Sequence, residues 1–190
     1  MKFVSREYIS TLEIKKSKFI ASFFPYKDFD NVMKRLKEEY PKARHFVYAY
    51  RYLNEFDQIV ENSSDDGEPR GTSGRPSLKV MEGNELINSA VIIVRFFGGI
   101  KLGTGGLVRA YGDAVNNVIS QSQLEVYLKL ESKELIIKYN QLSQIEYVLN
   151  KLNINITNKE FSSDIILHLK ATQEQFHELE NNLPLNAKLN

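Results

Sequence analysis

The chain has no cysteine in its 190 residues, and no apolar run comes close to the ~18 residues that a membrane-spanning helix needs. The absence of cysteine excludes disulfide bonds, thiolate metal ligands and cysteine nucleophiles. Charged residues interrupt residues 1–14 and no small-residue cleavage site follows, so a signal peptide is not expected. These absences favour a cytoplasmic protein without a membrane partner.

The chain also has almost no excess of charge, since 25 basic and 24 acidic residues leave a net charge of +1. Such a balance produces no global electrostatic field that attracts nucleic acid or a membrane surface. Any electrostatic recognition must therefore be local. Hydrophobic residues make up 42% of the chain, which is enough for the core of one large or two small domains.

Glycine is missing from most of the chain, because all ten glycines lie within residues 67–112. Glycine permits positive φ angles and close approach of the backbone to another group, so this window is where a special turn is expected. Within it, residues 90–97 form an apolar run of strand length, residues 98–106 form a glycine-rich turn, and helical periodicity starts at Leu107. The free N–H groups at the start of a helix attract anions. The sequence therefore predicts an anion site here.

Hydrophobic periodicity predicts the elements of an N-terminal domain. The predicted elements are a hairpin over residues 8–24, a helix between Asp28 and Tyr40, strands over 45–52, 58–63 and 90–97, a short helix over 76–83, the helix from Leu107, and a last strand over 124–130. Aromatic residues alternate on one face of the strand over 45–52, and this pattern is more typical of core than of base stacking. They are Phe46, Tyr48, Tyr50 and Tyr52.

The polar residues 131–133 are the best candidate for a linker, which predicts domains over residues 1–131 and 134–190. After the linker the pattern reads strand, helix, strand, strand, helix. This order predicts a ferredoxin-like β-α-β-β-α lobe, whose closing strand has only residues 184–190 to come from. The sequence as a whole therefore predicts an α+β protein with two domains.

The glycine-rich turn matches neither standard nucleotide motif, because it lacks the terminal Gly-Lys-Ser/Thr of a Walker A loop and has Val108 in place of the last glycine of G-x-G-x-x-G. Tight packing of a helix on a strand explains the glycines equally well. An anion is favoured by Arg109, since a cation in the first turn of a helix opposes the helix dipole unless an anion binds there. The candidate anion-binding residues are Arg95, Gly98, Gly99, Lys101, Gly103, Thr104, Gly105, Gly106 and Arg109.

An acidic cluster, Asp65, Asp66 and Glu68, precedes this site. Arg95 interrupts an otherwise apolar strand, and a buried guanidinium needs a carboxylate or a ligand. A structural pair with one of the three acids is the favoured interpretation. The alternative is that Asp66 and Glu68 hold Mg²⁺, which binds a few carboxylates together with waters and phosphates. His45 is interpreted as a strand-end histidine or, in an enzyme, as the general base.

Several segments resemble the signature of the IMPACT family, in its bacterial YigZ-like branch. They are DGEP at residues 66–69, GT at 71–72, GRP at 74–76, RFFGGIKLGTGGLVRAY at 95–111, KSKFI at 16–20 and ARH at 43–45. The resemblance implies an N-terminal α/β domain like the second domain of a small-subunit ribosomal protein, a fold shared with phosphate-handling kinases. It also implies a C-terminal lobe like the last domain of translation elongation factor G.

The eukaryotic relatives restrain a starvation-activated translation kinase, but they use an additional N-terminal domain with no counterpart in these residues, so that mechanism is not expected to transfer. For bacterial members, which have no agreed activity, a nucleic-acid or ribosome partner is suspected. Two positions depart from the family pattern. Phe96 stands where tyrosine is usual, and Val47 stands where many relatives have cysteine. Both departures weaken an enzymatic interpretation.

We therefore expect a translation-associated binding or regulatory protein that holds RNA or a phosphorylated ligand at the glycine-rich anion site. The first alternative is an enzyme acting on a phosphorylated metabolite. In that case Lys101 and Arg109 would bind phosphate, Asp66 and Glu68 would hold Mg²⁺, and His45 would be the base. The second alternative is a protein-interaction scaffold whose glycine-rich turn is only structural. The oligomeric state is left open.

Overall fold

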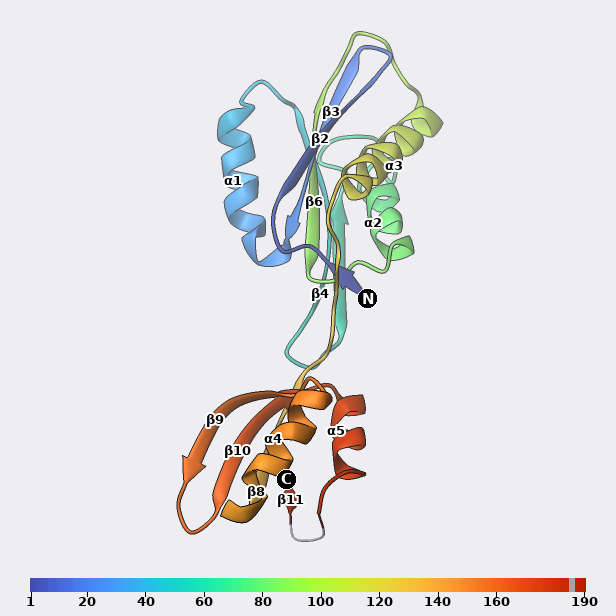
Figure 1. Cartoon of the computed structure of the whole chain (residues 1–190). Coiled ribbons are helices and arrows are strands. Elements are labelled where there is room, and N and C mark those ends of the chain that lie inside the picture. The colour runs from blue at the N-terminus through green and yellow to red at the C-terminus, as the bar shows by residue number, and fades with distance from the viewer. Residues whose placement is uncertain (185–186) are drawn as a thin grey trace. The chain divides into compact units, whose positions relative to one another are not determined.

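The computed structural model describes residues 1–184 and 187–190, which form two compact units (Figure 1). The first unit is Met1–Tyr127 and the second is Leu128–Asn190. Both mix helices with β-sheets, as predicted, and each unit has its own hydrophobic core. None of the five helices in the described part of the chain has the length and apolar character that crossing a bilayer requires.

A five-stranded antiparallel sheet with the order β2-β3-β6-β4-β5 forms the centre of the first unit. Its central strand β6 is buried along almost its whole length, which agrees with the apolar run in the sequence. The strands are β2 (Tyr8–Ile14), β3 (Ser17–Pro25), β4 (His45–Leu53), β5 (Ile59–Ser64) and β6 (Ser89–Phe96).

Helices cover both faces of this sheet (Figure 1). Helix α1 (Phe29–Glu39) packs on one face, and α2 (Gly74–Gly83) and α3 (Thr104–Ser120) pack on the other. Because side chains alternate along a strand, Val91 and Ile93 of β6 enter the core beneath α2 and α3, whereas Ile92 and Val94 enter the core beneath α1. This double covering explains why β6 is apolar on both faces.

The alternating aromatic residues of β4 lie on the face that α1 covers. Phe46 is buried there, and Tyr48 and Tyr50 are half-buried against the same core, so the predicted core role is confirmed for these three. Tyr26, in the short 3₁₀ turn η1 (Tyr26–Asp28), stacks on Tyr52 with ring centroids 4.1 Å apart. Burial together with the neighbouring Tyr50 and Tyr52 raises the pKa of Tyr26 to about 12, so its phenol is neutral at physiological pH.

Two very short strands join the beginning and the end of the first unit. Strand β1 (Lys2–Phe3) pairs antiparallel with β7 (Glu125–Val126), and the N–H of Tyr127 donates to the carbonyl of Met1 at 3.0 Å. The predicted strand over residues 124–130 is therefore wrong in length. Since β1 has only two residues, it can pair with only two residues of the alternating segment, and residues 127–130 lie outside any strand.

The second unit has the element order β-α-β-β-α-β and a four-stranded sheet with the order β11-β8-β10-β9. Both helices lie on one face of this sheet (Figure 1). The closing strand β11 is present and pairs antiparallel with β8. The elements are β8 (Glu131–Ile137), η2 (Tyr139–Gln141), α4 (Leu142–Lys151), β9 (Asn155–Phe161), β10 (Ile165–Ala171), α5 (Gln173–Glu180) and β11 (Lys188–Leu189).

Residues 131–133 are not a linker. They are the first residues of β8, and Glu131 and Lys133 pair with Ala171 and Leu169 of β10. The prediction is wrong because three polar residues at the start of a half-exposed strand have the composition of a loop. The boundary between the units falls after Tyr127.

This boundary generates a prediction about proteolysis. We expect trypsin under limiting conditions to cut first after Lys129, because residues 127–130 belong to no strand or helix and Leu128 and Leu130 are exposed. The N-terminal fragment should keep a cooperative thermal transition, since its core is complete without the second unit. Mass spectrometry and circular dichroism check this. A fragment that unfolds on cleavage, or a first cut inside α4 or β10, would contradict it.

Candidate functional site

Four loops meet at one end of the first unit's sheet, which we call the loop end. They are the β2–β3 turn (residues 15–16), the α1–β4 loop (40–44), the β5–α2 loop (65–73) and the β6–α3 loop (97–103). The register places them together, because Arg95 near the end of β6 lies opposite both Phe19 near the start of β3 and His45 at the start of β4. All predicted site residues except Arg109 lie in these loops or within three residues of them in the chain.

Asp65 stabilises the conformation of the β5–α2 loop. Its Oδ1 accepts hydrogen bonds from the Ser73 N–H at 3.0 Å, the Ser73 hydroxyl at 2.7 Å and the Gly74 N–H at 2.9 Å. Its Oδ2 accepts from the Gly71 N–H at 2.6 Å. Burial alone would raise the pKa of Asp65, but these four donors outweigh burial and lower the pKa below its usual value. Asp65 therefore caps the start of α2 and is structural.

Asp66 connects the same loop to the first residues of β4. Its carboxylate accepts from the Phe46 N–H at 2.5 Å, and its main-chain carbonyl lies 2.8 Å from Nδ1 of His45. A carbonyl only accepts hydrogen bonds, so Nδ1 carries the proton and Nε2 is the nitrogen left for another partner. The loop thus fixes both the orientation and the tautomer of His45.

Glu68 is the carboxylate partner that Arg95 was expected to need. Its Oε1 accepts from Arg95 Nη1 at 2.5 Å and from the Tyr111 hydroxyl at 2.8 Å. All three side chains are at least nine-tenths buried. Burial and the Glu68 charge both raise the pKa of Tyr111, which keeps its hydroxyl protonated as a donor. We call Glu68, Arg95 and Tyr111 the buried triad.

A pocket of about 330 Å³ opens above the triad at the loop end. Lys42 and Arg44 are exposed there and make no hydrogen bond or ion pair within residues 1–184 and 187–190. Nε of Arg95 is buried without a partner among the described residues. We call this the basic pocket. It is lined by Lys42, Arg44, His45, Arg95, Phe96 and Phe97.

Sequence reasoning found His45 and Arg95 but missed Lys42 and Arg44 as site residues. Both lie in the α1–β4 loop, far in sequence from Arg95, and only the pairing of β4 with β6 brings them to it. The ARH segment at residues 43–45, part of the family resemblance, was the signal that could have found Arg44.

The glycines of the predicted anion site have different structural roles. At Gly98 a Cβ atom would lie 2.0 Å from the carbonyl carbon of Lys16, so glycine is required for close packing against the β2–β3 turn. Gly99 and Gly103 have φ angles of 86° and 73°, which favour glycine. Around Gly105, within α3, a Cβ would meet nothing within 4 Å. The packing explanation therefore holds for Gly98.

The structure changes the interpretation of Arg109. Helix α3 begins at Thr104, so Arg109 is beyond its first turn and the argument from the helix dipole does not apply. The prediction started the helix at Leu107 because Gly105 and Gly106 have the composition of a turn. Arg109 and Lys101 are exposed and have no partner in the described part of the chain, but neither lines the basic pocket. The first turn of α3 has no side-chain cap and no acidic residue.

The proposed Mg²⁺ ligands do not converge. Asp66 accepts from the Phe46 N–H, whereas Glu68 accepts from Arg95 and Tyr111. Across residues 1–184 and 187–190, no group of three or more His, Asp or Glu side chains lies where it could hold a metal ion. The carboxylates of Asp66 and Glu68 both accept hydrogen bonds from donors of the protein itself.

Comparisons with known proteins agree with the sequence signature. The model of the Impact N-terminal domain matches residues 15–119. An IMPACT family member of Haemophilus influenzae is 33% identical over 174 residues, which cover 90% of this chain and 84% of that protein. The IMPACT family member YigZ of Escherichia coli is 36% identical over 161 residues, covering 83% and 78%. The chain belongs to the IMPACT family. Within it, the chain is YigZ-like.

A solved structure described as that of a hypothetical protein matches this IMPACT-family chain along almost its whole length. It shares 30% identity with a TM-score of 0.66, and the match covers 99% of this chain and 95% of the other. The region matched by the family model contains the loop end, the buried triad and the basic pocket. Of the two departures from the family pattern, Phe96 lines this pocket, whereas Val47 is fully buried in the core.

The glycines provide a paired stability test. Gly98→Ala should destabilise the first unit by about 3 kcal/mol or more, because the new Cβ overlaps backbone atoms that cannot move aside. Gly105→Ala should be neutral or stabilise by up to about 1 kcal/mol, since its Cβ meets open space in a helix. Urea unfolding measures both. Equal effects would show that the turn does not pack as described.

Asp65 gives a pH-dependent prediction. Its folded-state pKa lies below the usual 3.8, so its contribution to stability is present above that value and is lost as the pH falls through the folded pKa. Asp65→Asn should therefore lower the free energy of unfolding at about pH 7 and show a smaller deficit at about pH 2.5. Asp113→Asn, at an exposed position on α3, is the matched control and should change little. A deficit for Asp65→Asn that is constant with pH would rule out this role.

Proposed function

We propose that this IMPACT-family chain is a cytoplasmic, translation-associated regulatory protein that binds the phosphates of RNA at the loop end. The observation that carries the proposal is the basic pocket, where Lys42, Arg44 and Arg95 lie with His45 around one cavity. Glu68 neutralises only Arg95, and it lies below the pocket floor. Lys42 and Arg44 are therefore available to an anionic ligand.

The chemistry of the pocket suits a phosphate group. Phosphate oxygens are strong acceptors, and arginine presents several N–H donors in a fixed plane. Nε2 of His45 is the unoccupied ring nitrogen and adds one more polar contact. Phe97 is 58% exposed beside these donors, so the ring face that Arg95 does not cover is available for a base to stack on it.

An extended polyanion is favoured over a single small phosphate. Further exposed cations lie outside the pocket lining, with Lys16 and Lys101 in loops of the loop end and Arg109 on α3, and none has a partner in the part of the chain that the structure describes. A small phosphorylated ligand would fill the pocket without using them. A nucleic-acid backbone reaches several such cations at once, and each contact that it makes strengthens binding.

The translational part of the proposal rests on the family. The resemblance implies a ribosomal-protein-like first domain and a second domain like the last domain of elongation factor G. The β-α-β-β-α-β order of the second unit, with the sheet order β11-β8-β10-β9, supports its ferredoxin-like assignment. A ribosome or an RNA of the translation machinery is therefore the proposed partner.

A phosphorylated metabolite as substrate is the second candidate, and the fixed tautomer of His45 favours it. A general base needs an oriented, unoccupied nitrogen, and Nε2 has that property. However, Lys101 and Arg109 lie outside the pocket lining, and the carboxylates of Asp66 and Glu68 bind protein donors. The pocket therefore lacks the remaining groups that the enzymatic interpretation requires, and binding is the better supported function.

Fluorescence anisotropy with a labelled single-stranded RNA tests the proposal. Exchanging both Lys42 and Arg44 for Gln should weaken binding and reduce the slope of log K against log[salt] by about 1.4, the value for two lost phosphate contacts on a single strand. The control exchanges Lys34 and Lys79 for Gln, which removes the same charge from exposed positions on α1 and α2. Equal losses in both double variants, or displacement of RNA by inorganic phosphate at equal concentration, would contradict the proposal.

A further inference from the structure

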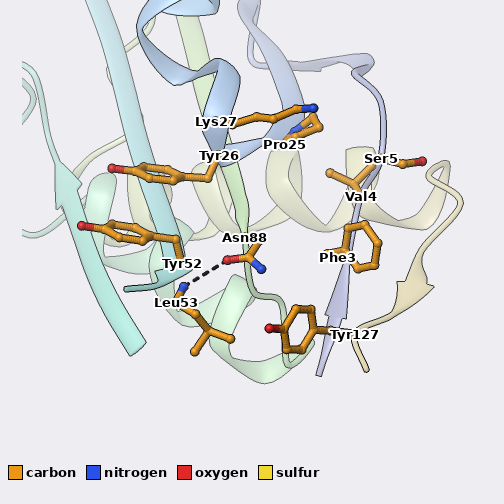
Figure 2. A pocket seen from close by; sticks show the side chains of 10 residues that line it. All are labelled: Phe3, Val4, Ser5, Pro25, Tyr26, Lys27, Tyr52, Leu53, Asn88 and Tyr127. Carbon is orange, nitrogen blue, oxygen red and sulfur yellow. Dashed lines mark hydrogen bonds between the residues drawn. The ribbon is translucent and has the colours of Figure 1, made fainter. Parts of the chain in front are cut away.

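A second pocket of about 440 Å³ lies at the end of the first unit's sheet opposite the loop end (Figure 2). Strand β3 ends there at Pro25, β4 ends at Leu53, and Asn88 immediately precedes β6. We call it the aromatic pocket. It is lined by Phe3, Val4, Ser5, Pro25, Tyr26, Lys27, Tyr52, Leu53, Asn88 and Tyr127, and it shares no residue with the basic pocket.

Aromatic side chains form two walls of this pocket, on either side of Asn88, and Figure 2 shows the rings of Tyr26 and Tyr52 extending away from Asn88. Tyr26 and Tyr52 form one wall as a parallel stack with an interplanar angle of 4°, and the stack is held against the aromatic face of β4. Phe3 and Tyr127 form the other wall, and Figure 2 shows them on the far side of Asn88 from the tyrosine stack. The pairing of β1 with β7 fixes the positions of Phe3 and Tyr127. The walls are therefore built before any ligand arrives.

Asn88 supplies unused donors at the centre of the pocket. Its carbonyl accepts from the Tyr26 N–H at 2.9 Å, and its Oδ1 accepts from the Leu53 N–H at 3.0 Å. The first bond, to the main-chain carbonyl, fixes the backbone, and the second orients the side chain with Nδ2 turned toward Phe3 and Tyr127 (Figure 2). Within the described ranges, the two N–H donors of Nδ2 have no partner. An oriented amide that lacks acceptors marks a place where a ligand oxygen is favoured.

The lining of this pocket carries one positive charge, and the carboxylate of Asp30 lies outside the lining but close enough to add to burial in raising the pKa of Tyr26. Lys27 is exposed at its edge, with no ion pair among residues 1–184 and 187–190, and none of the ten lining residues carries a carboxylate. One cation does not make a binding surface for a polyanion. It does complement a ligand with one negative charge.

We propose that the aromatic pocket binds a small planar aromatic carboxylate. The ring packs against Phe3 and Tyr127, its carboxylate accepts from Nδ2 of Asn88, and Lys27 at the pocket edge adds positive charge. The volume is within the range of small-molecule sites, and such sites combine apolar walls with a few oriented polar groups. This ligand site is independent of RNA binding at the loop end.

The test uses the full chain and 2-naphthoate as the probe, with neutral 2-naphthylmethanol as the uncharged comparison, in calorimetric and NMR titrations. Wild type should bind naphthoate more tightly than the alcohol. Asn88→Asp is the deciding variant. Aspartate keeps an oxygen for the Leu53 N–H and tolerates the positive φ of 50° at this position, but it replaces the two donors by a repelling oxygen.

Asn88→Asp should weaken naphthoate binding at least tenfold and alcohol binding much less, with little change in Tm. Lys27→Gln should weaken only naphthoate binding, by a few-fold. Asn31→Asp and Lys34→Gln on α1 make the same chemical changes at exposed positions outside the pocket and should leave binding unchanged. No binding of naphthoate to wild type at millimolar concentration would overturn the inference. Equal binding of naphthoate by wild type and both pocket variants would do so as well.

Discussion

One buried carboxylate, that of Glu68, determines how the loop end of the first unit is assembled. It joins the β5–α2 loop to Arg95 on the central strand and to Tyr111 on α3. A charge in such a site is stable only when it is paired, and removal of one partner from a buried pair costs about 3–5 kcal/mol. The conformation of the acidic loop is thus coupled to the packing of the helix and the strand beneath it.

This coupling also shapes the proposed binding surface. Because Nη1 of Arg95 is held by Glu68, its guanidinium is fixed in the lining of the basic pocket, 5.5 Å from the ring centroid of Phe19 and 5.7 Å from that of Phe97. Lys42 and Arg44 lie on a loop, are exposed and have no partner among the described residues. The pocket therefore combines one cation held by an ion pair with two exposed unpaired cations, and the proposed binding of phosphates in chains of different sequence would use the latter.

The sequence predicted what depends on local periodicity. The apolar run over residues 90–97 became β6, and the aromatic alternation from Phe46 onward became part of the core beneath α1, since both patterns record which face of a strand is buried. Prediction from the sequence was wrong where the composition of a segment is not typical of the structure that the segment forms. Gly105 and Gly106 are helical although glycine is typical of turns, and residues 131–133 form a strand although they are polar.

Features that depend on tertiary pairing had no local signal. The side-chain amide of Asn88 is oriented by the N–H of Leu53, which donates to its Oδ1 and lies 35 positions away in the chain. Likewise, the sequence showed three acids but not their separate tasks, because only the fold decides that Asp65 caps a helix, Asp66 orients His45 and Glu68 binds Arg95. Candidate residues could thus be identified from the sequence, but the structural role of each one could not.

The pairing of β1 with β7 makes the first unit a closed module. Its first and last residues are hydrogen-bonded neighbours, since Tyr127 donates to the carbonyl of Met1. A domain whose ends meet can be inserted into a loop of a host protein, or opened at a different loop and joined at its old ends, without straining its core. A tag fused to Met1 would begin two residues before Phe3, which lines the aromatic pocket, so a tag at this end should be removed before the proposed ligand is tested.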